Sequence, residues 1–280
     1  MSKFAAILKK DFLVNKKNII IPYIIMAVFF ILMAAIFLVQ SGKMEFKFDD
    51  LYVNFDDPSG ASSYIANIFM LVLPGLLSVI FTLLIAQSAL NEDLRRNCEL
   101  FHRSQPVSVW TRTISKFIVA IAGNWVFLIV LGIFNLVVSA IILTQFVPFH
   151  FGKALVGFTQ VFIGFAKFNL IIGSLAFFCS AIFKDKALLK GLAILVGIHV
   201  FLGILHTFMN IYIPSPITYL GKLLQDTSFN FDSSLNHNLK TFILDRWQQL
   251  VLNPKALIQV AFSGVMFVAG TLIYNNREVK

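Results

Sequence analysis

The long apolar runs of this 280-residue chain contain polar and ionisable side chains, six of which are candidates to line a pathway. They are Gln160, Lys167, Asn135, His199, His206 and Asn210. An ammonium at the middle of a bilayer costs about 2.5–3.5 kcal/mol on insertion scales, so Lys167 should face protein or water. There it could meet an anionic group on a cargo, with the other five lining a pathway. The alternative is that these side chains hydrogen-bond between helices. We favour this packing role, with Lys167 the residue best suited to a direct function.

Regular spacing groups several of these residues on helix faces. Gln160, Lys167 and Ser174 recur every seven residues and would form one polar stripe. His199 and His206 are seven residues apart in another apolar run. Two histidines alone do not make a metal site, because zinc sites in proteins use at least three protein ligands. We therefore expect no metal in this chain.

The sequence contains none of the short patterns that bring catalytic groups together. It has no G-x-x-x-x-G-K-[ST] loop to hold the phosphates of ATP, and no H-E-x-x-H, G-x-S-x-G or C-x-x-C pattern. These absences predict a protein that is not itself an enzyme. The alternative is a membrane enzyme that acts on lipid or peptide through His199, His206 and Lys167. That alternative lacks a paired acid and base at suitable spacing.

The elements that would position these residues are apolar helices. Hydrophobic residues make up 58% of the chain and charged residues only 13%, too few to cover the surface of a soluble domain. A helix needs about 20 apolar residues to cross the ~30 Å hydrocarbon core. Six runs are long enough, at about 19–39, 64–90, 117–146, 154–183, 187–213 and 256–274. We predict an all-α membrane protein with six transmembrane helices in one domain over 1–280.

The basic residues sort by side of the membrane. Fifteen of the 23 lysines and arginines fall in the two tails and in the second and fourth connections between runs. With six spans these segments share one side, and the positive-inside rule makes that side the cytosol. Both termini are thus expected in the cytosol. The net charge of +9 is accounted for by this bias, so we expect no nucleic-acid partner.

Two segments outside the spans have helical patterns of their own. Apolar residues recur at helical spacing over 2–17, with lysines largely elsewhere on the wheel, which predicts an amphipathic helix in the cytosolic headgroup layer. The outer segment 214–254 is long and contains a further helical pattern over 239–252. We expect re-entrant or interfacial helices there, just before the sixth span.

A charged segment over 91–116 separates the second and third runs. Joining two antiparallel helices needs only a few residues, whereas this connection has about 26. Leu94, Cys98 and Phe101 fall at i, i+4 and i+7 and give one apolar edge, and Pro106 would end such a helix. A short helix with an aromatic knob and a charged rim suits a groove on a partner. The alternative is a solvated loop held by lipid phosphates.

The same segment resembles the permease signature of type-2 ABC transporters. The resemblance rests on Glu92-Asp93, Glu99-Leu100, Gln105-Pro106-Val107-Ser108 and Lys116, and the six-span topology extends it over the whole chain. Asn97-Cys98 departs from the family, which commonly has a Gly-Thr pair there. The resemblance implies a permease subunit, more in keeping with export than import, whose coupling helix docks on a separate nucleotide-binding ATPase. ATP and Mg²⁺ would bind to that partner, and a second permease copy or homologue would complete the transporter.

The resemblance also assigns residues to the ATPase contact. In the coupling segment these are Arg95, Arg96, Glu99, Phe101, His102, Arg103 and Pro106. Lys184 and Asp185, between the fourth and fifth runs, would form a second contact or an ordinary basic turn. A third class of function stays open, a membrane assembly or regulatory protein that uses the segment only for docking. The Lys-, Ile-, Asn- and Phe-rich composition fits a multi-pass protein of a bacterial plasma membrane.

Overall fold

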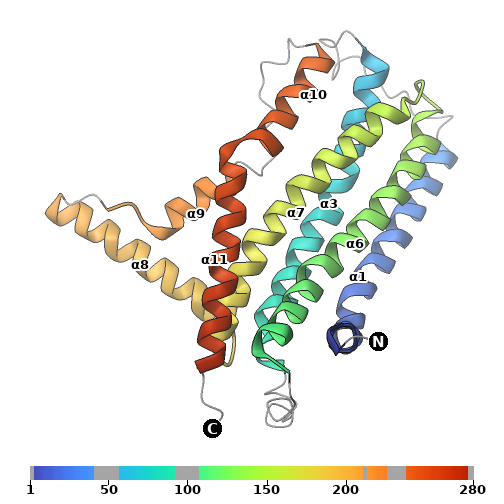
Figure 1. Cartoon of the computed structure of the whole chain (residues 1–280). Helices are drawn as coiled ribbons and strands as arrows, with labels where there is room; N and C mark the ends of the chain where they lie inside the picture. The colour runs from blue at the N-terminus through green and yellow to red at the C-terminus, as the bar shows by residue number, and fades with distance from the viewer. Residues whose placement is uncertain (1–2, 41–56, 93–106, 211–212, 226–237, 277–280) are drawn as a thin grey trace.

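The computed structural model describes residues 3–40, 57–92, 107–210, 213–225 and 238–276 (Figure 1). Within these ranges the chain is helical and contains no strand. Its elements are α1 (Lys3–Gln40), α3 (Pro58–Ala89), α6 (Val109–Leu143), α7 (Phe151–Ile182), α8 (Ala187–Met209), α9 (Pro216–Gln225), α10 (Leu239–Trp247), the π-helix η1 (Gln248–Leu252) and α11 (Pro254–Asn276). Six helical segments are long and apolar enough to cross a membrane. The predicted all-α architecture with six candidate spans is confirmed.

The helices extend beyond the predicted runs where side chains can cap their ends. The prediction started the second span at 64, but α3 begins at Pro58 because the Asp57 carboxylate accepts a hydrogen bond from the Gly60 amide at 2.9 Å. The third span, predicted from 117, begins at Val109, where the Ser108 hydroxyl accepts from the Thr111 amide. In contrast, α8 stops at Met209, four residues before the predicted end, because Asn210 adopts a left-handed conformation with φ 53°.

The N-terminal part of the chain forms one continuous helix. The sequence predicts a separate interfacial helix over 2–17 and a span over 19–39, whereas α1 runs from Lys3 to Gln40. Figure 1 shows the first turns of α1 nearly end-on, while the rest of the helix runs along α6. The first part of α1 is therefore turned away from the direction of the span, within a single helix that also contains Pro22.

Helices α3 and α7 form the centre of the bundle. They pack along most of their length, with α6 also against α3, α1 against α6, and α11 against α7 (Figure 1). Small residues allow this approach: a Cβ on Gly157 of α7 would lie only 2.7 Å from the Tyr64 carbonyl oxygen of α3. The buried cluster between the two helices includes Tyr64, Ile68 and Phe158.

Two helices leave this bundle. Helix α8 points away from it, with only Ala187 and Gly191 buried, and α9 packs on α8 (Figure 1). Helix α10 and η1 continue into α11 and lie against α7. The first turns of α1 and the last turn of α11 lie at the same end of the bundle, which we call the terminal end; α10 lies at the opposite end (Figure 1).

Candidate functional site

The polar stripe of α7 holds the segment formed by α10 and η1. Gln160 is fully buried, and its Nε2 donates a hydrogen bond of 3.0 Å to the Ile243 carbonyl. The Oε1 atom of the same side chain accepts from the Tyr64 hydroxyl of α3. Lys167 is half-buried, and its Nζ donates a hydrogen bond of 2.8 Å to the Leu250 carbonyl. Two of the three residues of the predicted stripe, Gln160 and Lys167, thus donate to backbone carbonyls of another element, whereas the Ser174 hydroxyl donates to the Ile171 carbonyl of its own helix.

These two contacts have matching spacing. Gln160 and Lys167 are seven residues apart, as are their partners Ile243 and Leu250. Leu250 belongs to the π-helix η1, in which backbone carbonyls are displaced from the α-helical pattern. The cation of Lys167 suits such a carbonyl, because charge-assisted hydrogen bonds are stronger than neutral ones. The stripe therefore fixes the position of α10 and η1 along α7.

A second cation, Arg246, comes from α10 itself. Its side chain is only 8% exposed, and its Nη1 lies 3.5 Å from the Gln249 Oε1 in η1. On the same segment, Leu239 and Ile243 enter the buried cluster that contains Tyr64. The segment is thus attached to α3 and α7 by both polar and apolar contacts.

Asn135 and its neighbours join α6 to α3. Asn135 is fully buried and donates from Nδ2 to the Met70 carbonyl at 3.3 Å. Ser139 donates to the Asn67 Oδ1 at 3.1 Å, and Asn124 donates to the Thr82 hydroxyl at the same distance. These buried polar side chains bridge helices of the bundle.

Sequence reasoning missed the partners on α3. Asn67, Ser78 and Thr82 are almost fully buried and bond to Ser139, Asn169 and Asn124 in turn. Their spacing of eleven and four residues puts them on one helical face. This helical spacing of polar residues is the signal in the sequence that could have identified them.

His199, His206 and Asn210 lie on or at the end of the outlying helix α8. His199 is hydrogen-bonded through Nδ1 to the Ser215 hydroxyl at 2.6 Å. His206 is exposed in the last turn, and Asn210 caps that turn instead of lying within a span. His199 and Asn210 make these contacts on α8 and the segment that follows it, whereas Gln160 and Lys167 contact α10 and η1. The described ranges hold no group of His, Cys, Asp and Glu that could bind a metal ion.

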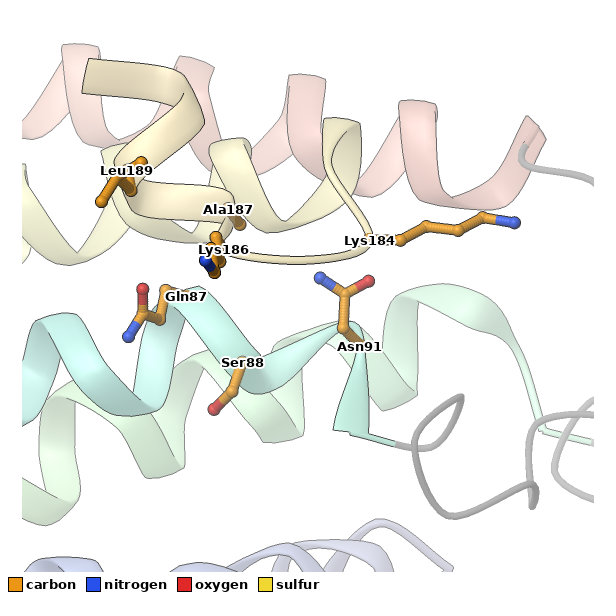
Figure 2. Close-up of a pocket in the computed structure, with 7 residues that line it drawn as sticks. All are labelled: Gln87, Ser88, Asn91, Lys184, Lys186, Ala187 and Leu189. Atoms are coloured by element: carbon orange, nitrogen blue, oxygen red, sulfur yellow. The ribbon is translucent and has the colours of Figure 1, made fainter. Parts of the chain in front are cut away.

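At the terminal end, Asn91 joins α3 to the turn between α7 and α8. Its Nδ2 donates to the Ser180 carbonyl at 3.1 Å and to the Phe183 carbonyl at 2.8 Å. Beside it lies a cavity of about 290 Å³ (Figure 2), whose lining includes Lys184 and Lys186. Figure 2 shows the Lys184 side chain extending away from Lys186. Lys184 and Asp185, the predicted second ATPase contact, are both exposed in this turn.

Two further contacts fix the helices around the same end. Asp11 of α1 is 5% exposed and accepts from the Ser115 hydroxyl of α6 at 2.7 Å. Lys116 of α6 donates from Nζ to the Ala89 carbonyl of α3 at 2.7 Å. The coupling residues of the sequence prediction fall within 93–106, outside the described residues; they are Arg95, Arg96, Glu99, Phe101, His102, Arg103 and Pro106. Both flanks of that segment are therefore firmly attached to the bundle.

The fold and these contacts define a class, a multi-pass helical membrane protein. Comparison with known protein families found no match, and comparison with curated proteins found none either.

Proposed function

We propose that this chain is the permease subunit of an ATP-driven transporter of the type-2 ABC class, acting as an exporter. The resemblance of residues 91–116 to the permease signature motivates the proposal. The observation that carries it furthest is the Asn91 contact, which joins the end of α3 to the turn containing Lys184 and Asp185. Both segments assigned to the ATPase by resemblance then move as one unit.

In this proposal the protein lies in a bacterial plasma membrane with its terminal end facing the cytosol. Two permease subunits pair side by side in that membrane. A separate nucleotide-binding subunit holds ATP and Mg²⁺ and docks on residues 91–116. Closure of the ATPase pair would push on the coupling segment. That push would reach α3 directly and α7 through Asn91, while Lys116 would pass it to α6 through the Ala89 carbonyl. The spans would then alternate between states open to either side.

The membrane-enzyme alternative has less support. Two of its three residues contact different elements: His199 contacts Ser215, and Lys167 contacts Leu250 next to α11. An assembly or regulatory protein would use the coupling segment for docking without any movement of the spans. That alternative predicts partner binding without ATP-dependent change.

The test is purification of the full chain in mild detergent from its native host, with assay of ATP hydrolysis in the purified complex. Phe101→Ala and Glu99→Arg should each release the ATPase or uncouple its hydrolysis from transport. Phe208→Ala and Asp245→Arg are matched controls at exposed positions of α8 and α10 and should leave both readouts unchanged. Unchanged ATPase binding and unchanged transport in Phe101→Ala and Glu99→Arg would refute the proposal.

A further inference from the structure

The turn between α7 and α8 carries cations that pair with nothing in the described part of the chain. Lys184 and Lys186 lie in this turn, Lys190 follows in α8, and all three side chains are exposed. None of the three ammonium groups makes an ion pair or a hydrogen bond with a described residue. Three lysines and one aspartate, Asp185, give residues 184–190 a net charge of +2. The turn therefore attracts an acidic group from outside the chain.

The same turn forms one side of the cavity beside Asn91 (Figure 2). Lys184 and Lys186 line it from the turn, and Gln87 and Ser88 line it from the last turn of α3. The Gln87 side chain is half-buried, and its amide makes no hydrogen bond with any described residue. Its nitrogen can therefore donate to a ligand that enters the cavity. The described residues of the lining include neither Asp nor Glu, so the cavity suits a carboxylate or another anion.

The cavity lies where three candidate spans end. The spans over Pro58–Ala89 and Phe151–Ile182 end beside it, and the span over Ala187–Met209 begins there. Lys184 and Lys186 fall between the second and third of these spans, outside the apolar segments. A charged partner can thus reach both lysines from the water at this end of the bundle.

The direction of Lys184 favours a partner that lies beyond the bundle. Figure 2 shows its side chain extending away from Lys186, in the direction in which α11 ends. That direction leads to the terminal end of the molecule, where the last turn of α11 lies (Figure 1). A lysine that holds a lipid headgroup would instead lie beside the spans, where the bilayer is. The ammonium of Lys184 is placed to meet a molecule that covers the terminal end.

We propose that the turn between α7 and α8 binds an acidic segment of the partner ATPase. Asp or Glu carboxylates of that segment pair with Lys184 and Lys186, and one carboxylate enters the cavity and accepts a hydrogen bond from Gln87. The inference rests on the proposed function and names the chemistry of its second ATPase contact. Asn91 supports it, because this residue begins the segment 91–116 and donates to the Phe183 carbonyl at 2.8 Å. An ATPase seated on that segment lies next to the lysines.

The first test is zero-length cross-linking of the purified complex between the full chain and its ATPase. A water-soluble carbodiimide joins a lysine amine to a carboxylate only where the two are in contact. Peptide mass spectrometry should find Lys184 or Lys186 joined to an Asp or Glu of the ATPase. Lys184→Arg/Lys186→Arg keeps both charges but has no reactive amine, so it should retain the ATPase and lose the cross-link. The exposed Lys240, on α10 at the opposite end, should not be joined to the ATPase.

The second test reverses the charge of the turn. Lys184→Glu/Lys186→Glu should bind the ATPase at least about tenfold more weakly, because like charges then face each other. Retention of the ATPase on the purified chain measures this, at one fixed low salt concentration, since salt screens exposed charges. Lys222→Glu/Lys240→Glu is the matched control. It changes two exposed lysines of α9 and α10 that do not line the cavity, and it should bind the ATPase normally.

The outcomes separate this inference from the proposed function. Absence of any ATPase from the native complex would refute the proposed function itself. An ATPase that binds the native and charge-reversed chains equally, with no cross-link to Lys184 or Lys186, would overturn the acidic contact alone. A third outcome is that Lys184→Glu/Lys186→Glu keeps the ATPase but loses phosphatidylglycerol, measured by native mass spectrometry from nanodiscs. The lysines would then bind a lipid phosphate, and the inference would be wrong.

Discussion

Lys167 on α7 and Leu250 in η1 are joined by a hydrogen bond of 2.8 Å from the ammonium to the main-chain carbonyl. One helical heptad before it, Gln160 makes the equivalent contact with Ile243. The cation that the sequence places inside the membrane is therefore used to hold a neighbouring segment. If that segment moves during a functional cycle, Lys167 must release a carbonyl that has few other donors in an apolar layer.

Lys167→Met should loosen η1 without unfolding the bundle. Methionine fills similar volume and removes a cation from the apolar layer, but it cannot donate to the Leu250 carbonyl. A hydrogen bond from a charged donor contributes about 1.5–3 kcal/mol, so the amides of 248–252 should exchange at least about tenfold faster. Hydrogen–deuterium exchange with mass spectrometry measures this rate. Lys153→Met, two turns from Gln160 on the same helix, should leave it unchanged. Unaltered exchange in Lys167→Met would show that the contact does not hold η1.

Tyr64→Phe should destabilise the packing of α3 on α7 through Gln160. The change removes the hydroxyl that donates to the Gln160 Oε1 and leaves this buried acceptor unpaired. The expected cost is about 1–3 kcal/mol in the free energy of unfolding. The measurement is a double-mutant cycle with Gln160→Leu, followed by thermal unfolding in detergent. The two changes should be strongly non-additive, because Gln160→Leu removes the acceptor that Tyr64→Phe exposes. Simple additivity would show that the two side chains act independently.

The membrane spans could be predicted because the length and apolarity of the runs are compatible with only one structure, a helix that crosses the bilayer. A run such as 154–183 is too long and too apolar to be anything but a spanning helix, and α7 covers nearly all of it. The polar stripe that contains Gln160 and Lys167 was predictable from their seven-residue spacing. The partner of Gln160 was not, because the Ile243 carbonyl is a backbone group that every residue carries. A sequence shows donors that need partners, but it does not show which carbonyl is near.

The position of His199 shows another limit of sequence reasoning. Helical spacing places His199 and His206 on one face of a helix, but it does not say what that face meets. Helix α8 leaves the bundle after Gly191, so the two histidines do not face the stripe of α7. Its direction depends on the turn at Lys186, whose φ of 47° is a left-handed conformation that few non-glycine residues adopt. Nothing in the residue type at 186 predicts it.

Asp57 should stabilise the start of α3 in a pH-dependent way. The pKa of this carboxyl is lowered, chiefly by the hydrogen bond from the Gly60 amide and also by the Ser59 hydroxyl and the charges of His150 and Lys153, while burial opposes the change. A group whose pKa is lower in the folded protein contributes fully above its unfolded pKa. The contribution is lost as the pH falls through the folded pKa.

The corresponding variants are Asp57→Ala and Asp57→Asn. Asp57→Ala should cost about 1 kcal/mol at pH 7, as for other N-caps, and this difference from the native protein should shrink below about pH 4. Asp57→Asn can still accept from the Gly60 amide and has no charge to lose, so its stability should follow the native protein at pH 7 without that acid-linked loss. Thermal unfolding between pH 7 and pH 3 measures both. A cost for Asp57→Ala that is the same at every pH would contradict the role of the charged carboxylate.

Gly157→Ala should force α3 and α7 apart. A Cβ at this position would lie 2.7 Å from the Tyr64 carbonyl oxygen and 3.2 Å from its ring. The oxygen belongs to the backbone of a packed helix and cannot move alone, so the whole contact must shift. Such overpacking costs about 1–3 kcal/mol, and it would also displace the Tyr64 hydroxyl from Gln160.

Gly203→Ala is the matched control, because nothing lies within 4 Å of its added Cβ. The control should be neutral or stabilising by up to about 1 kcal/mol, since alanine favours helix over glycine. The measurement is the unfolding midpoint of the two variants in the same detergent. If Gly157→Ala is as stable as Gly203→Ala, α3 and α7 are not in close contact at Gly157.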